Sequence, residues 1–207
     1  MAQRIGLYGG SFNPIHNGHL IVARDIAERI NLDQIILLPA SHPPHKDAGT
    51  LLDPAHRAAM VKLAIEGDPL FAFSDFDLKR SGPNYTIETV MHFREVLGPD
   101  VALHWLIGAD SLAELITWRR VSDLVNACRI VTAGRQGCTA IDWTKLASVL
   151  SDEQVTLLKS GVLPTAQVDI SSSDIRRRVS EGRSIRYLVP DPLRSFIDRN
   201  GLYRSIL

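Results

Sequence analysis

The fold is decided by the stretch Ile5-Gly6-Leu7-Tyr8-Gly9-Gly10-Ser11-Phe12-Asn13-Pro14-Ile15-His16-Asn17-Gly18-His19. It opens with an apolar run typical of a strand, breaks at two adjacent glycines and leads into residues 20–30, whose apolar side chains recur at helical spacing. This order predicts a strand, a glycine turn and a helix. Glycines let backbone N–H groups approach a ligand, and a helix start adds unpaired N–H donors and the positive end of the helix dipole. Such a turn suits a phosphate group.

Two histidines stand at the predicted helix start. His16 and His19 are three residues apart, so both imidazoles are expected on one face, where each is able to donate a hydrogen bond to the same anion. Ordinary polar surface residues are the alternative interpretation of this pair. The dinucleotide fingerprint G-x-G-x-x-G and the P-loop pattern G-x-x-x-x-G-K-[ST] are both missing, which argues against dehydrogenases and P-loop kinases.

The composition narrows the classes of protein further. At 207 residues, the chain is long enough for one domain with a substantial core. Its 23 basic and 23 acidic residues balance, and without a long basic run no nucleic-acid partner is expected. Neither a signal peptide nor an apolar stretch of about 18 residues is visible, which predicts a soluble, cytoplasmic protein with no membrane partner. Cys128 and Cys138 lack C-x-x-C spacing and are expected to be reduced structural thiols.

Two motifs, one near each end of the chain, carry a resemblance to a known family. Residues 9–19 resemble the opening motif of the H-x-G-H nucleotidyltransferases, and within that group their sequence is most similar to the motif of the bacterial nicotinate-nucleotide adenylyltransferases. Residues 170–176, Ile-Ser-Ser-Ser-Asp-Ile-Arg, resemble the second motif of that family, I-S-S-T-x-I-R. Ser173 replaces the threonine of the motif and keeps its hydroxyl group.

The order of apolar patterns predicts an α/β fold. Continuous apolar runs at 34–39 and 102–107 are typical of strands that are buried on both faces of a parallel sheet. Further elements are expected as strands at 71–76, 129–133 and 168–170, and as helices at 53–65, 85–97 and within 142–161. Together with the resemblance, this indicates a Rossmann-like, open and mainly parallel sheet with helices on both faces. We expect a single nucleotidyltransferase domain, with a core over residues 1–170 and a small C-terminal helical part over 171–207.

The resemblance also implies which residues form the site. Those expected to act in catalysis are His16, His19, Lys46 and Arg176. Those expected to bind ATP are Gly9, Gly10, Ser11, Phe12, His19, Gly108, Asp110, Ser172, Ser173 and Arg176. Those expected to bind nicotinate mononucleotide are Tyr85, Thr86 and Trp118.

Several of these residues have a structural alternative. Lys46 lies on a proline-containing loop after a strand and could reach a phosphate, although alone it is typical of a solvated lysine. Asp110 suits ribose hydroxyls or a helix cap. The helix start at Tyr85 and Thr86 could hold a carboxylate or be capped in the ordinary way. Trp118 could stack on a pyridinium ring or belong to the core, and its charged neighbours argue against full burial.

The expected activity is direct transfer of the adenylyl group of ATP to nicotinate mononucleotide, giving deamido-NAD and pyrophosphate. No nucleophilic Ser–His–Asp or Cys–His arrangement is evident, so catalysis is expected to come from positioning and charge stabilisation. Mg²⁺ is expected to bridge phosphates, with no metal site built from protein ligands. The alternatives are a pantetheine-phosphate adenylyltransferase or another H-x-G-H nucleotidyltransferase, and a noncatalytic nucleotide sensor. A homo-oligomer and the preference between nicotinate and nicotinamide mononucleotide are left open.

Overall fold

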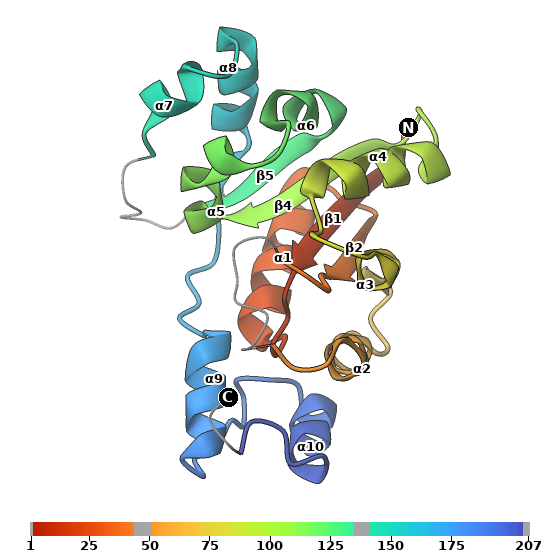
Figure 1. The fold of residues 1–207 in the computed structure, drawn as a ribbon, viewed down its shortest axis with the longest axis vertical. Helices are drawn as coiled ribbons and strands as arrows, with labels where there is room; N and C mark the ends of the chain where they lie inside the picture. The colour runs from red at the N-terminus through yellow and green to blue at the C-terminus, as the bar shows by residue number, and fades with distance from the viewer. Residues whose placement is uncertain (1, 44–50, 135–140, 205–207) are drawn as a thin grey trace.

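A parallel sheet forms the centre of the computed structural model, which describes residues 2–43, 51–134 and 141–204 (Figure 1). Its strands stand in the order β3-β2-β1-β4-β5-β6, and neighbouring strands are parallel throughout. The strands are β1 Arg4–Gly10, β2 Gln34–Pro39, β3 Phe71–Phe73, β4 Ala102–Gly108, β5 Arg129–Gly134 and β6 Val162–Pro164. This arrangement confirms the expected Rossmann-like fold class.

The order of the strands reverses between β1 and β4. The chain builds from β1 through β2 to β3 at one edge, and then returns to β4 on the other side of β1. In open α/β sheets, ligands bind in the crevice outside the carboxyl ends of the strands at such a reversal. Gly10 and Gly108 end these two strands, so the reversal brings the glycine turn and the segment after β4 to the same crevice.

Helices cover both faces of the sheet. They are α1 Asn17–Ile30, α2 Pro54–Ala64, α3 Phe76–Lys79, α4 Thr86–Leu97, α5 Ala109–Ala113, α6 Val121–Ala127, α7 Trp143–Ala147, α8 Asp152–Ser160, α9 Ser172–Ser180 and α10 Asp191–Arg199, with a 3₁₀ turn at Leu115–Thr117. On one face, α4, α6 and α8 contribute Val90, Leu124 and Leu158 to a buried cluster. On the other, α1 and α2 contribute Ile26 and Met60 to a second cluster, which α9 and α10 extend with Ile175 and Leu193. Figure 1 shows α7 and α8 at one end of the molecule and α9 and α10 at the other.

The two buried clusters explain why the central strands read as unbroken apolar runs. Successive side chains of a strand point to opposite faces. In β4, Trp105 and Ile107 therefore join the first cluster, while Leu106 joins the second. A strand covered on both faces has no position for a solvated side chain, which is typical of parallel sheets. No helix in the described part of the chain combines the length and the apolar character that crossing a membrane requires.

One predicted strand is too long, and another is wrong. The strand expected at 71–76 ends at Phe73, and Phe76 instead begins α3. The hydroxyl of Ser74 accepts a hydrogen bond from the backbone N–H of Phe76 at 3.2 Å. Such local bonds compete with the hydrogen bonds between neighbouring strands, so the strand ends here. The strand expected at 168–170 has no regular structure, because Val162–Pro164 pairs with β5 as the edge strand instead. The assignment of the whole chain to one domain, with a boundary near residue 170, stays a prediction.

Gly161 provides a test of the packing between α8 and β5. A Cβ added to Gly161 would lie 2.1 Å from the carbonyl oxygen of Ile130, a backbone atom of a buried strand. We expect Gly161→Ala to lower the free energy of unfolding by about 2–3 kcal/mol, because the strand must shift to make room. Gly108→Ala is the matched control, since nothing lies within 4 Å of the added Cβ. Urea unfolding measures both variants. Equal losses of the free energy of unfolding in Gly161→Ala and Gly108→Ala would contradict this packing.

Candidate active site

The two predicted histidines lie against each other at the start of α1. His16 is the N-cap residue and His19 stands on the first turn, with ring centroids 3.7 Å apart and the rings inclined by 26°. The backbone N–H of His16 donates to Nδ1 of His19 at 3.2 Å, which fixes the second ring. Gly18 lies between them, where a Cβ would come within 3.0 Å of Nδ1 of His16. The glycine of the H-x-G-H motif therefore leaves space for the first imidazole.

His16 is held as a neutral ring. The residue is buried, and burial lowers the pKa of His16 to about 4 because a charged imidazole would lose its hydration. Its Nδ1 atom is buried and has no hydrogen-bond partner within the described part of the chain. A neutral imidazole still donates one hydrogen bond, so His16 is able to bind an anion without carrying a charge itself.

Arg57 of α2, which the sequence analysis assigned to no site, fixes the turn after β1. Its guanidinium is fully buried and donates to the carbonyl oxygens of Ser11 at 2.9 Å, Ala40 at 2.6 Å and Leu52 at 2.9 Å. Ser11 belongs to the glycine turn, and Ala40 follows β2 directly. Arg57 therefore joins three segments that border the carboxyl edge of the sheet. Helical periodicity gave no signal for it, because a buried arginine occupies an inward position that normally carries an apolar residue.

The second motif reaches the first across almost the whole length of the sequence. Arg176 of α9 donates through Nη1 to the carbonyl oxygen of Asn13 at 2.9 Å, and its Nη2 donates to Oγ of Ser173 at 3.2 Å. The hydroxyl of Ser172 donates to the carbonyl oxygen of Pro14 at 2.8 Å. The buried hydroxyl of Tyr203 donates to Oδ1 of Asn13 at 2.9 Å. The two motifs, whose residues are expected at one ATP site, are therefore in direct contact.

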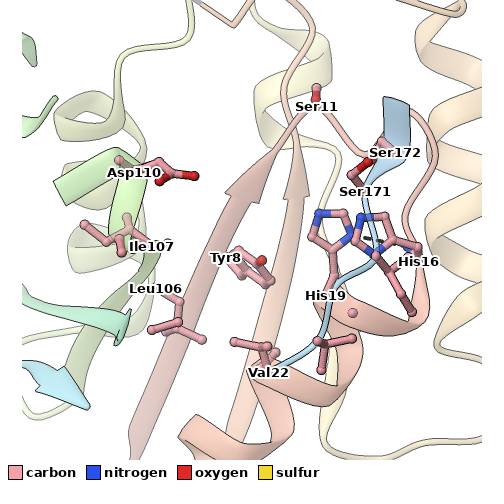
Figure 2. Close-up of a pocket in the computed structure, with 18 of the residues that line it drawn as sticks. Tyr8, Ser11, His16, His19, Val22, Leu106, Ile107, Asp110, Ser171 and Ser172 are labelled. Carbon is pink, nitrogen blue, oxygen red and sulfur yellow. Dashed lines mark hydrogen bonds between the residues drawn. The ribbon is translucent and has the colours of Figure 1, made fainter. Parts of the chain in front are cut away.

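A cavity of about 580 Å³ opens between these elements. Figure 2 shows His16 and His19 side by side on one wall, Asp110 on the opposite wall and Tyr8 between them. Its lining includes the predicted residues Ser11, Gly108, Ser172, Ser173 and Arg176, together with Val22, Ala23 and Ile26 of α1. One end of this cavity therefore offers hydroxyl, imidazole and guanidinium groups, while α1 adds an apolar wall.

A second cavity of about 480 Å³ adjoins the first. Both cavities are lined by His19, which therefore stands where they meet, and by Tyr8, Ser11, Leu106, Ile107, Gly108 and Ser111. Burial raises the pKa of Tyr8 to about 12, which keeps its hydroxyl protonated. The predicted residues Thr86 and Trp118 line the second cavity, and Trp118 is half-buried.

The other predicted residues divide between the second cavity and its surroundings. Gly9, Gly10 and Phe12, expected to bind ATP, line the second cavity. Tyr85 lines neither cavity and is the N-cap residue of α4, with the guanidinium of Arg119 over its ring at 4.6 Å. Lys46 lies outside the described residues.

A buried polar network at the second cavity is absent from the sequence-based site. Asn84 accepts hydrogen bonds from the hydroxyl of Ser41 at 3.0 Å and the backbone N–H of His42 at 2.7 Å. Its amide nitrogen donates to the carbonyl oxygen of Asp77 at 2.8 Å. The carboxylate of Asp77 accepts from Thr89 at 2.7 Å, and burial is the main cause that raises its pKa. This network ties the end of β2 to the start of α4, and hence holds Thr86 in place.

The sequence comparison identifies the family. The model of the cytidylyltransferase-like family matches residues 7–178. A protein of Thermomicrobium roseum named "probable nicotinate-nucleotide adenylyltransferase" is 40% identical over 99% of this chain and 93% of its own length. The chain belongs to this family of nucleotidyltransferases. A relative with the same name from Dehalococcoides mccartyi is 37% identical over 98% of both chains.

Solved structures agree with the fold of this adenylyltransferase family. The nicotinic acid mononucleotide adenylyltransferase of Plasmodium falciparum, in complexes with APC and with NaAD, aligns over 98% of both chains with a TM-score of 0.73. The identities are 20% and 21%, so this likeness concerns the fold alone.

The buried neutral state of His16 predicts a pH-dependent stability. The unfolded chain binds a proton at His16 near pH 6.5, whereas the folded protein resists this until about pH 4. The unfolded state therefore binds more protons in this window, and the free energy of unfolding should fall as the pH drops from 6.5 toward 4. The slope due to His16 should approach at most about 1.4 kcal/mol per pH unit.

Urea unfolding at a series of pH values tests this dependence. We expect His16→Gln to have a smaller slope than the wild type, with a residual slope in the same direction from His104, whose pKa burial also lowers. His56→Gln, outside both cavities, is the control and should keep the wild-type slope. A slope unchanged in His16→Gln would show that His16 titrates normally.

Proposed function

We propose that this protein transfers the adenylyl group of ATP to nicotinate mononucleotide, forming deamido-NAD and pyrophosphate in NAD biosynthesis. The observation that carries the proposal is the position of His19 where two cavities meet. Phosphate-binding groups line one cavity, and an indole and a helix start line the other. The names of the relatives, probable nicotinate-nucleotide adenylyltransferase, support both substrates.

The first cavity suits ATP. Ser172, Ser173 and Arg176 surround the start of α9, whose free N–H groups and dipole favour anions, and would hold the β- and γ-phosphates. His16 and His19 would hold the α-phosphate between the two cavities. Asp110 on the opposite wall would accept hydrogen bonds from ribose hydroxyls (Figure 2).

The second cavity suits the acceptor. The face of Trp118 would stack on the positively charged pyridinium ring. Thr86 stands at the first position of α4, where backbone N–H groups are free to receive a carboxylate. The network through Asn84 and Asp77 fixes that helix start, which favours an acid group of defined position.

The reaction needs no covalent enzyme intermediate. A phosphate oxygen of the acceptor attacks the α-phosphorus of ATP in line. As that bond forms, the bond from the α-phosphorus to the α–β bridging oxygen breaks, and the electron pair leaves with pyrophosphate. The two imidazoles and Arg176 act by holding the phosphates and by stabilising charge that develops on their oxygens.

Mg²⁺ is proposed as the metal ion that accompanies ATP. Asp110 is the one carboxylate among the described residues that line the first cavity, and no three His, Cys, Asp or Glu side chains in the described ranges form a cluster able to hold a metal ion. This lining fits an ion held mainly by phosphate oxygens and water. When bound, Mg²⁺ would neutralise charge on the leaving pyrophosphate. Roles for Lys46 and Tyr85, a cytoplasmic location and a homo-oligomer stay predictions.

A noncatalytic nucleotide sensor is the second candidate. The adjoining second cavity favours the enzyme, because a sensor needs affinity for ATP without a site for an acceptor.

Pyrophosphate release with a panel of acceptors tests the proposed reaction. The protein is incubated with ATP, Mg²⁺ and, separately, nicotinate mononucleotide, nicotinamide mononucleotide and phosphopantetheine. We expect the highest kcat/KM with nicotinate mononucleotide, because the start of α4 favours a carboxylate. Release with phosphopantetheine alone would identify the alternative acceptor, and no release with any acceptor would favour the sensor.

His19→Ala tests the position between the cavities. Removal of one donor to the α-phosphate should lower kcat by roughly 10²- to 10³-fold, while the melting temperature stays close to that of the wild type. His56→Ala, which removes a histidine outside both cavities, should keep the wild-type rate. A His19→Ala variant with near-normal turnover would overturn the proposed role of this imidazole.

A further inference from the structure

One wall of the first cavity lacks regular secondary structure. Residues 165–170 connect β6 to α9, and Thr165, Ala166, Val168 and Ile170 line the cavity. No helix or strand fixes this segment, so individual hydrogen bonds help to set its position beside the packing of Thr165 and Ile170. It ends at Ser171, the N-cap residue of α9, so it also leads directly into the phosphate-binding motif.

The segment is held at both ends. At its far end, Ser172 is bonded to the carbonyl oxygen of Pro14. At its start, the backbone N–H of Ala166 donates to Oδ2 of Asp25 at 2.8 Å, across 141 residues of sequence. The hydroxyl of Thr165 donates to the carbonyl oxygen of Gly134 at 3.3 Å, a longer and weaker bond. The backbone N–H of Thr165 also donates to this oxygen at 3.4 Å, so the bond to Asp25 is the shortest hydrogen bond at the start of the segment.

Asp25 belongs to the same helix as the histidines. It lies six residues after His19 on α1, a rise of about 9 Å at 1.5 Å per residue. Its Oδ1 atom accepts from Nε of Arg29 at 2.9 Å, so the bond from Ala166 uses the other carboxylate oxygen. Val22 and Ala23 line the cavity between these points and Ile26 lines it just beyond Asp25, and Figure 2 shows Val22 beyond His19 along this wall. A single rigid helix thus links the phosphate-binding end to the wall at 165–170.

We propose that Asp25 is a positioning residue that fixes the wall of the nucleotide cavity at the nucleoside end. The inference rests on the proposed function, since it assumes that ATP occupies the first cavity with its phosphates at the histidines and α9. Asp25 acts through Ala166 and does not touch the nucleotide. Its hydrogen bond is charge-assisted, and such bonds are shorter and stronger than neutral ones. Without it, Ala166 and Val168 would lose their fixed distance from α1.

Dissociation constants for ATP and for inorganic tripolyphosphate test this role. We expect Asp25→Ala to weaken ATP binding by roughly five- to tenfold, the equivalent of one hydrogen bond. Binding of tripolyphosphate, which uses only the phosphate end, should stay within about twofold of the wild type. A general disturbance of the structure would lower the affinity for both ligands equally. The ratio of the two losses therefore distinguishes a positioning role of Asp25 from a general loss of stability.

Two further variants serve as controls. Asp25→Asn keeps an oxygen acceptor for the N–H of Ala166 and should restore most of the affinity for ATP. Arg29→Ala removes the ion pair at Oδ1 but leaves the bond from Ala166, so it should also bind ATP nearly as the wild type does. Hydrogen exchange at the Ala166 amide should be faster in Asp25→Ala than in either control.

The possible failures are distinguishable. Equal ATP affinity in Asp25→Ala and the wild type, or equal loss of ATP and tripolyphosphate binding, overturns the role of Asp25. These binding measurements need no acceptor and no turnover. A wild type that binds ATP but releases no pyrophosphate with any acceptor overturns the proposed function. The role of Asp25 is then still decided by the loss of ATP affinity compared with the loss of tripolyphosphate affinity in Asp25→Ala. A wild type that binds no ATP overturns both.

Discussion

The hydrogen bonds that converge on Asn13 hold the site together. Its carbonyl oxygen accepts from Arg176, 163 residues away, and its side-chain oxygen accepts from Tyr203, 190 residues away. A third donor, the backbone N–H of Leu52, approaches the same side-chain oxygen at 3.4 Å. Asn13 and Tyr203 are buried, and a lost partner in such a place leaves a polar group unsatisfied at a large cost in free energy. The turn after β1 and the start of α9 are therefore kept in a fixed relation.

The charges around this centre are arranged to receive negative groups. Arg57 is buried against carbonyl oxygens rather than a carboxylate, and burial is the main reason that its pKa is lowered. His16 stays neutral because its pKa is lowered to about 4, so an anion at this position would not require a second buried charge on the protein. The site combines one forked cation at Arg176, imidazole donors and two helix starts, which together suit a triphosphate and a phosphate that must approach each other.

The reversal of strand order creates one crevice with room for two substrates. The segments after β1 and β4 meet there, and the two cavities of the crevice share the lining residues Tyr8, Ser11, His19, Leu106, Ile107, Gly108 and Ser111. Each cavity has its own polar scaffold away from the shared residues. At the second cavity, the hydrogen bonds of Asn84 and Asp77 fix the lining, and at the first cavity α1 and the segment 165–170 form a wall. Acceptor and nucleotide recognition can therefore vary separately around a common centre.

The sequence by itself determined the motifs, the α/β class and most of the strands, because glycine turns, helix starts and apolar periodicity are local features. Through the resemblance of two short motifs it placed His16, His19, Ser172 and Arg176 at one site, and all four line the first cavity. Only the tertiary structure decided which cavity Gly9 and Phe12 line, which strand forms the edge, and that Arg57, Asn84 and Asp25 bond to the segments around the two cavities. These three side chains act through hydrogen bonds to segments distant in sequence, and residue spacing carries no information about such contacts.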